Sequence, residues 1–385
     1  MSASAGAVKP MTSRQRVTEA INHREPDRMP MDLGMHTSTG ISAFAYSDLR
    51  AYLGLPAARI EIIDGVQMLA RVDEDILRLF GCDCVCLKPP VKEGYVWSPR
   101  DDYAFFVPEY YRPEASPNGE WTVRRNGQSM RMPTGGLFFD GDWLAMEDAW
   151  EPSFFRETAL EAERLFKETD YFTAFRGFYP FFNSDMDYFC DMMTDPVTLI
   201  RQNEVSLQTQ LRNAALLIDR MKGYIGAVCL SGDLGDQRAP MVRSDVFEAV
   251  SAPFLRVFCS FIHRHSDYKV FLHSCGAIEP LLPVLIDCGI DIINPVQITA
   301  GGMDPETLKK KYGGDLVFWG GGVDTQRLLP FGSPEQVAEN ARYLTGVFKP
   351  GGGYVFCPVH NIMGGTRPEN IAAAYEAARE NGMYR

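Results

Sequence analysis

Short apolar runs alternate with longer amphipathic stretches along most of this 385-residue chain. Eight of the runs are candidate strands, and the later ones are nearly continuous in apolar residues. Such runs predict β-strands that are buried on both faces, as in a parallel sheet covered by helices. The predicted strands lie at 29–34, 82–90, 171–178, 224–235, 269–277, 290–297, 316–326 and 352–362.

Helical patterns fill most of the gaps between these strands. Residues 12–28 begin with Thr12 followed by Gln15, a capping-box pattern that predicts a helix before the first strand. Residues 196–221 and 333–348 have helical periodicity. In the last helix, at 366–382, Thr366 and Glu369 are expected to form a second capping box, and Gly382 is expected to end the helix.

Eight strands alternating with helices predict an α/β fold of the (β/α)8 TIM barrel type, forming a single domain over residues 1–385. An open doubly wound sheet with fewer strands is the alternative. Residues from about 95 to 145 depart from the alternation, because they are rich in Tyr, Phe, Trp, Pro and Gly. We expect this insertion after the second strand to form β-hairpins that cover one end of the barrel.

Composition narrows the function classes. The chain carries 50 acidic and 38 basic residues, a formal net charge of −12, without a cluster of Lys and Arg, which disfavours nucleic-acid binding. Its first residues lack the apolar segment of a secretory signal, and no apolar run is long enough to cross a bilayer. The nine cysteines therefore predict reduced thiols in a cytoplasmic protein, some of them metal ligands.

Polar side chains follow five consecutive predicted strands. The active site of a (β/α)8 barrel lies at the C-terminal ends of its strands, so these side chains are expected to meet at one mouth. The residues concerned are Asp233, Asp236, Arg238, His273, Cys275, Asn294, Gln297, Asp324, Cys357, His360 and Asn361.

Two of these residues, His273 and Cys275, are spaced to bind one metal ion together. Residues i and i+2 of a strand point to the same face, and Cys357, three strands further on, could supply a third ligand. One imidazole and two thiolates suit zinc, and three protein ligands leave a position for substrate. Asp233 is expected to be the fourth ligand or an outer partner. Packing as small buried hydrophobes is the alternative for the cysteines, and we expect it for Cys82, Cys84 and Cys86.

Four stretches resemble the uroporphyrinogen decarboxylase superfamily: residues 14–32, 273–297, 318–341 and 358–378. The resemblance covers nearly the whole chain and implies a (β/α)8 barrel. The superfamily includes porphyrinogen decarboxylases and corrinoid-dependent methyltransferases, which typically use zinc. True decarboxylases carry the arginine-containing stretch "RQAGRYLPEYR" after the first strand, whereas residues 29–54 here lack its arginine pair. The sequence is more similar to the methyltransferase branch, whose H-x-C…C motif matches His273, Cys275 and Cys357.

This resemblance implies a zinc-dependent enzyme that moves a methyl group between a small substrate and a corrinoid. No D-x-H-x-x-G motif is present, so the corrinoid (cobalamin) is expected on a separate partner protein. The residues expected to orient the substrate are Asp233, Arg238, Gln297 and His360, and those expected to contact the cofactor are Asn294, Asp324 and Asn361.

Two other functions stay open at this point. A cofactor-free decarboxylase of a small or porphyrinogen-like acid would use Arg176 and Arg238 as the cations of the mouth. A non-catalytic corrinoid or folate carrier would bind without turnover. The sequence also leaves open the methyl donor or acceptor, the direction of transfer and the oligomeric state, for which a homodimer is one option.

Overall fold

The computed structural model describes residues 10–142 and 148–384. Residues 1–9, where no secretory signal is predicted, and the last three residues of the predicted insertion, 143–145, lie outside the described residues. Within the described residues, no single helix is both long and apolar enough to cross a membrane. Only two consecutive helices, taken together across a 63° bend, reach that length and composition.

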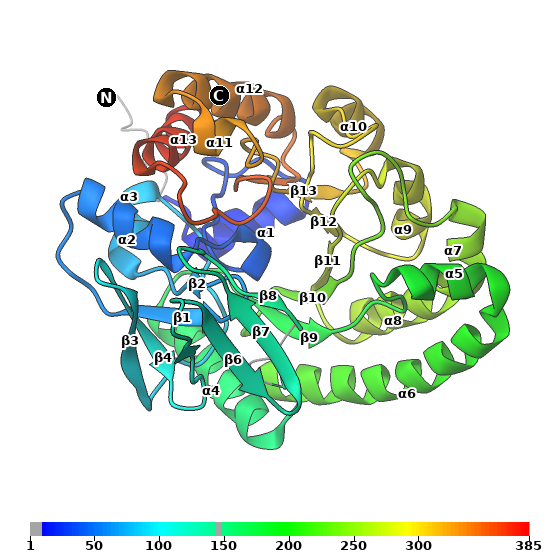
Figure 1. Ribbon diagram of the computed structural model, residues 1–385. Helices are drawn as coiled ribbons and strands as arrows, with labels where there is room; N and C mark the ends of the chain where they lie inside the picture. The colour runs from blue at the N-terminus through cyan, green and yellow to red at the C-terminus, as the bar shows by residue number, and fades with distance from the viewer. Residues whose placement is uncertain (1–9, 143–147, 385) are drawn as a thin grey trace, which may run out of the picture.

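A six-stranded parallel sheet forms the centre of the fold (Figure 1). Its strands are hydrogen-bonded in chain order, as a (β/α)8 barrel requires, whereas strand order reverses within a doubly wound sheet. Six of the eight predicted strands are thereby confirmed. They are β9 (Ala174–Phe178), β10 (Ala227–Ser231), β11 (Lys269–His273), β12 (Ile292–Asn294), β13 (Val317–Trp319) and β14 (Tyr354–Val355).

The first two predicted strands are wrong as strands. Residues 29–34 and 82–90 make only isolated parallel bridges, Met31 with Phe356 and Cys84 with Phe172. Backbone hydrogen bonds nevertheless place both segments between β14 and β9. These bonds run from Phe356 N to Pro30 O, Asp32 N to Phe356 O, Asp83 N to Met31 O, and Val85 N to Phe172 O.

A buried charge cluster explains why these two segments do not form regular strands. Pro30 has no N–H to donate, and the Met31 N–H donates to the Asp83 side chain at 3.0 Å. The fully buried Asp83 carboxylate also pairs with Arg16 at 2.6 Å and with Arg28 at 2.8 Å. Side-chain bonds thus replace part of the strand ladder at this point.

Helices lie around the outside of the parallel strands (Figure 1). Those before the sheet are α1 (Ser13–Ile21), the 3-10 helix η1 (Thr37–Thr39), α2 (Ala43–Tyr52), α3 (Glu74–Phe80) and α4 (Pro152–Glu168). Those between or after its strands are α5 (Met186–Thr194), α6 (Pro196–Met221), α7 (Ser244–Val250), α8 (Ala252–His265), η2 (Glu279–Leu281), α9 (Leu282–Asp287), α10 (Pro305–Tyr312), α11 (Leu328–Phe331), α12 (Pro334–Phe348) and α13 (Pro368–Asn381).

The two predicted capping boxes have different outcomes. The box at Thr12 is confirmed, with both reciprocal hydrogen bonds to Gln15 present. The box at Thr366 is wrong, because Arg367 is the N-cap of α13 and makes no side-chain capping bond. Pro368 occupies the first helical position, where its missing N–H is harmless. The helix ends at Gly382, as predicted.

The predicted insertion forms β-hairpins, as expected, but they join strands that sequence reasoning missed. One sheet has the order β2-β1-β4-β3 and another the order β5-β6-β7-β8. The parallel partner of β4 is the short β1, which precedes the insertion in the chain. The strands are β1 (Ile60–Asp64), β2 (Leu69–Ala70), β3 (Gly94–Arg100), β4 (Tyr103–Pro108), β5 (Glu114–Ala115), β6 (Trp121–Arg125), β7 (Gln128–Met132) and β8 (Asp140–Gly141).

Side chains on the inner face of the parallel strands pack into a core cluster of their own. Cys229, Phe271, Ile292 and Val317 lie level with one another in the strand register and belong to this cluster. Trp319 closes part of the same layer and is fully buried. The interior between the strands is therefore packed at this layer, as in a (β/α)8 barrel.

Candidate active site

The next inward positions on β10, β11 and β12 are polar. Because side chains alternate along a strand, the residues two positions after the packed layer point to the same interior. Ser231, His273 and Asn294 are level with one another in the register of β10, β11 and β12. Arg176 on β9 pairs with Cys229 of β10 just before a register shift. The sheet thus presents four polar side chains at the C-terminal ends of neighbouring strands.

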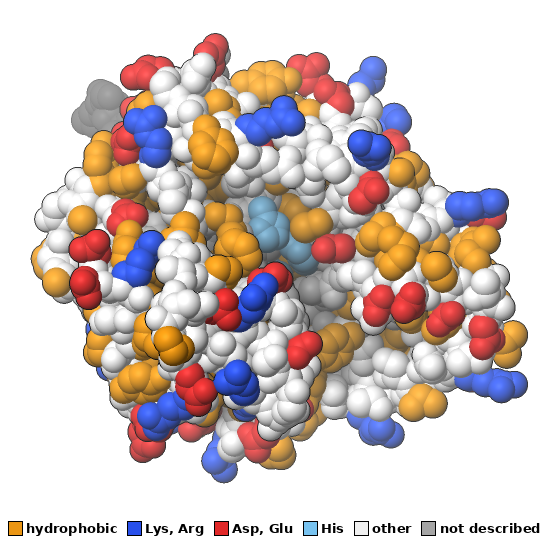
Figure 2. All heavy atoms as spheres, in the orientation of Figure 1, with side chains coloured by type: hydrophobic (Ala, Val, Ile, Leu, Met, Phe, Trp, Pro, Cys, Tyr) orange, Lys and Arg blue, Asp and Glu red, His pale blue; other side chains and the backbone are white. Residues whose placement is uncertain are grey.

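A cavity of about 470 Å³ lies above this polar layer. Figure 2 shows histidine side chains in a hollow near the centre of one face of the molecule. The cavity is lined by Met35, His36, Thr37, Ser38, Ile63, Asp64, Gln67, Cys86, Leu87, Lys88, Ala149, Phe154, Ala174, Arg176, Gly177, Phe178, Tyr179, Cys229, Ser231, His273 and His360. Among described residues, none of the predicted insertion lines it. One wall of the cavity is formed instead by the end of β1 and the turn after it, through Ile63, Asp64 and Gln67.

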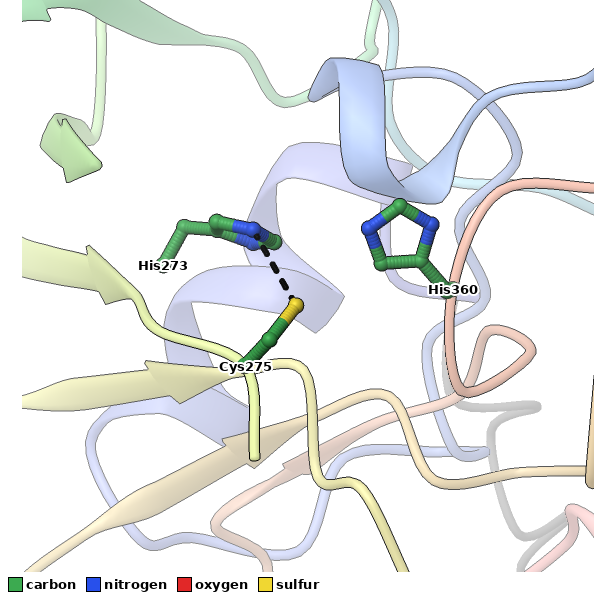
Figure 3. Close-up of side chains that lie close together, drawn as sticks. All are labelled: His273, Cys275 and His360. Atoms are coloured by element: carbon green, nitrogen blue, oxygen red, sulfur yellow. Dashed lines mark hydrogen bonds between the residues drawn. The ribbon is translucent and has the colours of Figure 1, made fainter. Parts of the chain in front are cut away.

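Three of the side chains expected at the mouth meet at one point. The ligand atoms of His273, Cys275 and His360 all lie within 4.8 Å of one another. Figure 3 shows the three side chains converging, with His273 Nε2 3.6 Å from Cys275 Sγ. The chain brings His273 and Cys275 together at the end of β11, while His360 comes from the loop after β14.

The structure differs from the sequence expectation at the third ligand. Cys357 is not in this group of side chains, because it is fully buried in the interior cluster beside Trp319 and Val355. Burial raises the pKa of the Cys357 thiol well above its ordinary value. His360, three residues further along the chain, takes the third position of the group instead.

The orientation of His273 leaves one specific nitrogen available. Its Nδ1 lies 2.8 Å from Asn294 Oδ1, while Asn294 Nδ2 donates to Trp319 O at 2.8 Å. The amide orientation therefore makes Asn294 Oδ1 the acceptor and His273 Nδ1 the donor. Burial, with His360 nearby, lowers the pKa of His273 to about 4, so the ring is neutral with its Nε2 lone pair free.

His360 repeats this arrangement. Its Nδ1 lies 2.8 Å from Asn361 Oδ1, and Asn361 Nδ2 donates to Gln67 Oε1. Burial lowers the pKa of His360 below its ordinary value. Metal-binding histidines commonly bind through one nitrogen while the other donates to a fixed oxygen. Both histidines thus present Nε2 in the form that a metal ion requires, and Asn294 and Asn361 act as their outer partners.

Asp233 and Gln297 hold the loop that carries Cys275. Asp233 Oδ1 accepts the Cys275 N–H at 2.8 Å and lies 3.8 Å from His273 Nε2. Burial, and then the Asp233 charge, raise the pKa of the Cys275 thiol. Gln297 Oε1 accepts the Gly276 N–H at 2.8 Å, and its amide donates to Gln237 at 2.9 Å. Asp233 therefore lies beside the side chains of His273, Cys275 and His360, called the metal group below. Gln297 stabilises the loop that carries Cys275, through its hydrogen bond to Gly276.

Two other predicted site residues lie away from this group. Arg238 is exposed and does not line the cavity. Asp324 accepts the backbone N–H groups of Gln326 at 2.8 Å and Leu328 at 3.2 Å, so it stabilises the turn into α11. A polar residue after a strand can stabilise the turn by accepting its backbone N–H groups. The sequence alone does not distinguish such a residue from one that binds a substrate.

Sequence reasoning missed His36. This histidine is buried, lines the cavity and stacks on His273 with ring centroids 5.4 Å apart. Burial, and then the charge of Arg176, lower the pKa of His36 well below its ordinary value. The signal was present, because "MHTST" follows the first predicted strand and the strand-end rule applies to it as well.

The cysteines of "CDCVC" divide into two kinds. Cys82 and Cys84 are buried, which confirms the packing prediction for them. Cys86 is half-buried and lines the cavity. It belongs to the wall formed by residues 86–88 and lies outside the group of His273, Cys275 and His360.

The donor set fits zinc. Two imidazole nitrogens and one sulfur are ligands that zinc prefers, and a catalytic zinc has three protein ligands and an open fourth position. His273, Cys275 and His360 could hold such an ion, and Asp233 or a substrate heteroatom could complete the coordination.

A family model and solved structures are similar to this chain. The family model described as "Uroporphyrinogen decarboxylase (URO-D)" matches residues 200–381. A methyltransferase from Methanosarcina mazei has a similar structure, with a TM-score of 0.57 and 18% sequence identity, covering 96% of this chain and 99% of that chain. No curated protein matches the chain significantly.

Two mandelate oxidase structures also align. One, a variant with 2-hydroxy-phenylacetamide, has a TM-score of 0.27 and 13% identity over 90% of this chain and 83% of that chain. The other, with benzoyl-formic acid, has a TM-score of 0.26 and 12% identity over the same shares of 90% and 83%. Their scores are too low to carry an argument. The matched residues 200–381 include β10 to β14 and all three side chains of the metal group, so this part of the chain is similar to the uroporphyrinogen decarboxylase family.

Proposed function

We propose that this protein is a zinc-dependent methyltransferase that moves a methyl group between a small methylated substrate, or an acceptor such as a thiol or folate, and a corrinoid. The observation that carries the proposal is the group of His273, Cys275 and His360, with both histidines turned to present Nε2. The similarity in fold to the Methanosarcina mazei methyltransferase supports the same function.

Each residue of the site would have a distinct role in this reaction. His273, Cys275 and His360 hold the ion, and Asn294 and Asn361 fix the two imidazoles. A zinc ion there supplies Lewis acidity, which polarises a leaving heteroatom or lowers the pKa of an acceptor thiol. Asp233, 3.8 Å from His273 Nε2, would complete the coordination or orient the substrate. The apolar wall, including Ile63, excludes water from the reacting atoms.

The corrinoid is expected to come from a partner protein, since this chain lacks a corrinoid-binding motif. The partner would dock at the mouth, so that its corrinoid faces the group of metal-binding side chains. A corrinoid bound there would supply the cobalt centre that exchanges the methyl group with a substrate held by His273, Cys275 and His360.

The proposal includes a closed (β/α)8 barrel formed by the whole chain as a single domain. The segments around Met31 and Cys84 would occupy the first two strand positions, between β14 and β9. The backbone hydrogen bonds that link Met31 to Phe356 and to Asp83, and Val85 to Phe172, support this closure.

Metal analysis tests the assignment of the ligands. Protein purified without chelators is expected to contain about one zinc ion per chain by mass spectrometry. Cys275→Ala and His360→Ala should lose the metal while keeping a cooperative thermal transition. Cys357→Ala is the matched control and should retain it. Zinc lost in Cys357→Ala but kept in His360→Ala would restore Cys357 as the third ligand, and folded wild-type protein without zinc would refute the centre.

A cofactor-free decarboxylase is the second candidate, favoured by the cationic Arg176 in the same cavity. It predicts release of CO₂ from a carboxylate substrate by chelator-treated protein. The methyltransferase proposal predicts that the same treatment abolishes turnover and that zinc restores it. Measuring CO₂ and methyl transfer before and after chelation therefore separates the two functions.

A further inference from the structure

The cavity of the candidate active site holds a cation that the metal group does not use. Arg176 lies on the inner face of β9, and its side chain lines the same cavity as His273 and His360. The strands β9 and β11 are two places apart in the sheet, so their backbones are separated by about 10 Å. A small molecule could therefore reach Arg176 with one end and the metal group with the other.

The structure around Arg176 fixes the direction of its side chain. The pairing of β9 with β10 shifts register directly after Arg176, at the position of Gly177. A Cβ at Gly177 would lie 2.7 Å from Ala149 and 2.8 Å from the Phe175 ring, so only glycine fits there. Such bulges change the aim of side chains next to active sites. Here both Arg176 and Phe178 border the cavity as a result.

Two further hydrogen-bonding side chains hold this strand end in place. The Trp150 indole N–H donates to Gly177 O at 2.7 Å. The buried Gln210 accepts the Tyr179 N–H at 2.9 Å and donates to Tyr179 O at 2.8 Å. The backbone on the C-terminal side of Arg176 is thus anchored at Gly177 and Tyr179, which fixes the point from which the Arg176 side chain enters the cavity.

The guanidinium itself has no hydrogen bond or ion pair with any of residues 10–142 or 148–384. The carboxylate of Asp64, on the same cavity wall, is already engaged by the backbone N–H groups of Val66 and Gln67 at 3.1 and 2.9 Å. Burial, and then the charge of Arg176, lower the pKa of His36; burial, and then His360, lower the pKa of His273, with a smaller contribution from Arg176. This charge therefore acts on the site without an ion pair to a carboxylate of the described chain.

We propose that the substrate of this site is a small carboxylate whose acidic group pairs with Arg176 while its reacting heteroatom reaches His273, Cys275 and His360. This inference rests on the proposed function and names its substrate class. A guanidinium binds a carboxylate through two parallel hydrogen bonds, which a neutral group cannot match. Between the two ends, the apolar side chains of Ile63, Leu87, Phe154 and Phe178 suit a flat or aliphatic body.

Binding of a simple probe tests the proposal. The affinities of benzoate and of its neutral analogue benzamide are measured by calorimetry on wild-type protein, Arg176→Gln and Arg176→Lys. Arg201→Gln, on the exposed side of α6, is the matched control. Wild-type protein should prefer benzoate. The preference should fall by about 10- to 100-fold in Arg176→Gln, fall less in Arg176→Lys and stay unchanged in Arg201→Gln.

The same titrations are repeated after chelation, because a carboxylate can also bind a metal ion directly. A preference that survives chelation and disappears in Arg176→Gln supports the proposal. A preference that is retained in Arg176→Gln, one that disappears with the metal, or the absence of benzoate binding by wild-type protein overturns it.

Zinc content, measured on every sample, reports on the proposed function separately. Folded protein without zinc that still distinguishes benzoate through Arg176 would refute the metal centre and leave the carboxylate site standing. A zinc-containing protein that does not prefer benzoate through Arg176 would refute the carboxylate site and leave the metal centre standing.

Discussion

At the scale of single residues, the candidate metal centre depends on two asparagines as much as on its ligands. The buried Asn294 accepts hydrogen bonds from His273 Nδ1 at 2.8 Å and from the Ser38 hydroxyl at 2.6 Å. Its amide nitrogen donates to Trp319 O, which fixes the rotation of the group. One side chain thus connects His273 to η1, through Ser38, and to β13, through Trp319.

Asn294→Ala should therefore weaken metal binding without removing a ligand. Loss of an outer partner of this kind typically lowers metal affinity by about 10- to 100-fold. The affinity is measured by competition with a chromogenic chelator. Asn370→Ala is the control, because Asn370 is equally buried but its amide nitrogen donates to Leu329 and Gly332 near α11.

Both substitutions should lower the free energy of unfolding by about 1–3 kcal/mol, since each leaves buried partners without a hydrogen bond. Only Asn294→Ala should change the zinc affinity. Equal affinities in the two variants would show that Asn294 is a structural residue and not a partner of the metal centre.

At the scale of elements, the close approach of two loops sets the position of Cys275. Gly276 has φ +94°, and a Cβ there would lie 2.1 Å from Gly235 O in the loop after β10. Gly276 also donates its N–H to Gln297 in the loop after β12. The loops that follow three neighbouring strands therefore meet directly behind the metal group.

Gly276→Ala should displace this loop and weaken zinc binding. Gly223→Ala is the matched control, because Gly223 has φ +82° but nothing lies within 4 Å of its Cβ position. The control should lose only about 1–2 kcal/mol of stability, the cost of a left-handed conformation for alanine. Gly276→Ala should lose more, because a backbone oxygen must also move.

Thermal unfolding and zinc titration of both variants measure these effects. If Gly276→Ala binds zinc as tightly as Gly223→Ala does, the packing of the loops does not control the position of Cys275.

At the scale of the whole molecule, the buried carboxyl group of Asp32 links the segment 29–34 to β13 through Trp319. Asp32 is fully buried, and it accepts the Trp319 indole N–H and the Met35 backbone N–H, both at 2.9 Å. Burial raises the pKa of Asp32 to about 6. The folded protein therefore holds the proton of this carboxyl more tightly than the unfolded chain does.

The contribution of Asp32 to stability should depend on pH with a defined sign. Since the folded pKa is the higher one, the free energy of unfolding falls as pH rises from about 4 to about 6 and is then constant. At about 1.4 kcal/mol per pH unit, the total change is about 3 kcal/mol. Urea unfolding of wild-type protein and Asp32→Asn across this range isolates the contribution of Asp32. Parallel profiles for the two proteins would contradict it.

Much of the fold was accessible from the pattern of apolar residues. Six predicted strands and the capped first helix are present, because β9 to β14 are continuous apolar runs with few competing signals. The segment at 29–34 failed as a strand because the bond from the Met31 N–H goes to Asp83, a residue more than fifty positions away. The strand β1 was missed because its parallel partner is β4, which follows it in the chain only after the predicted strand at 82–90.

For the site, the sequence by itself determined that His273 and Cys275 lie together. Alternation along a strand and the position of the strand's C-terminal end are local properties, and they suffice for residues two apart. The placement of polar residues at one mouth follows from the same local rule. The resemblance to the superfamily was also visible in the sequence, and a family model matches residues 200–381, which contain three of the four resembling stretches in full.

Only the tertiary structure decided the third member of the group and the roles of its neighbours. Cys357 and His360 follow the same short strand, and the packing around Trp319 buries the thiol while the imidazole reaches the mouth. The addition of His36 and the turning of both ligand histidines by asparagines likewise depend on contacts between distant segments. Such contacts form only when the strands lie side by side, so no local pattern in the chain specifies them.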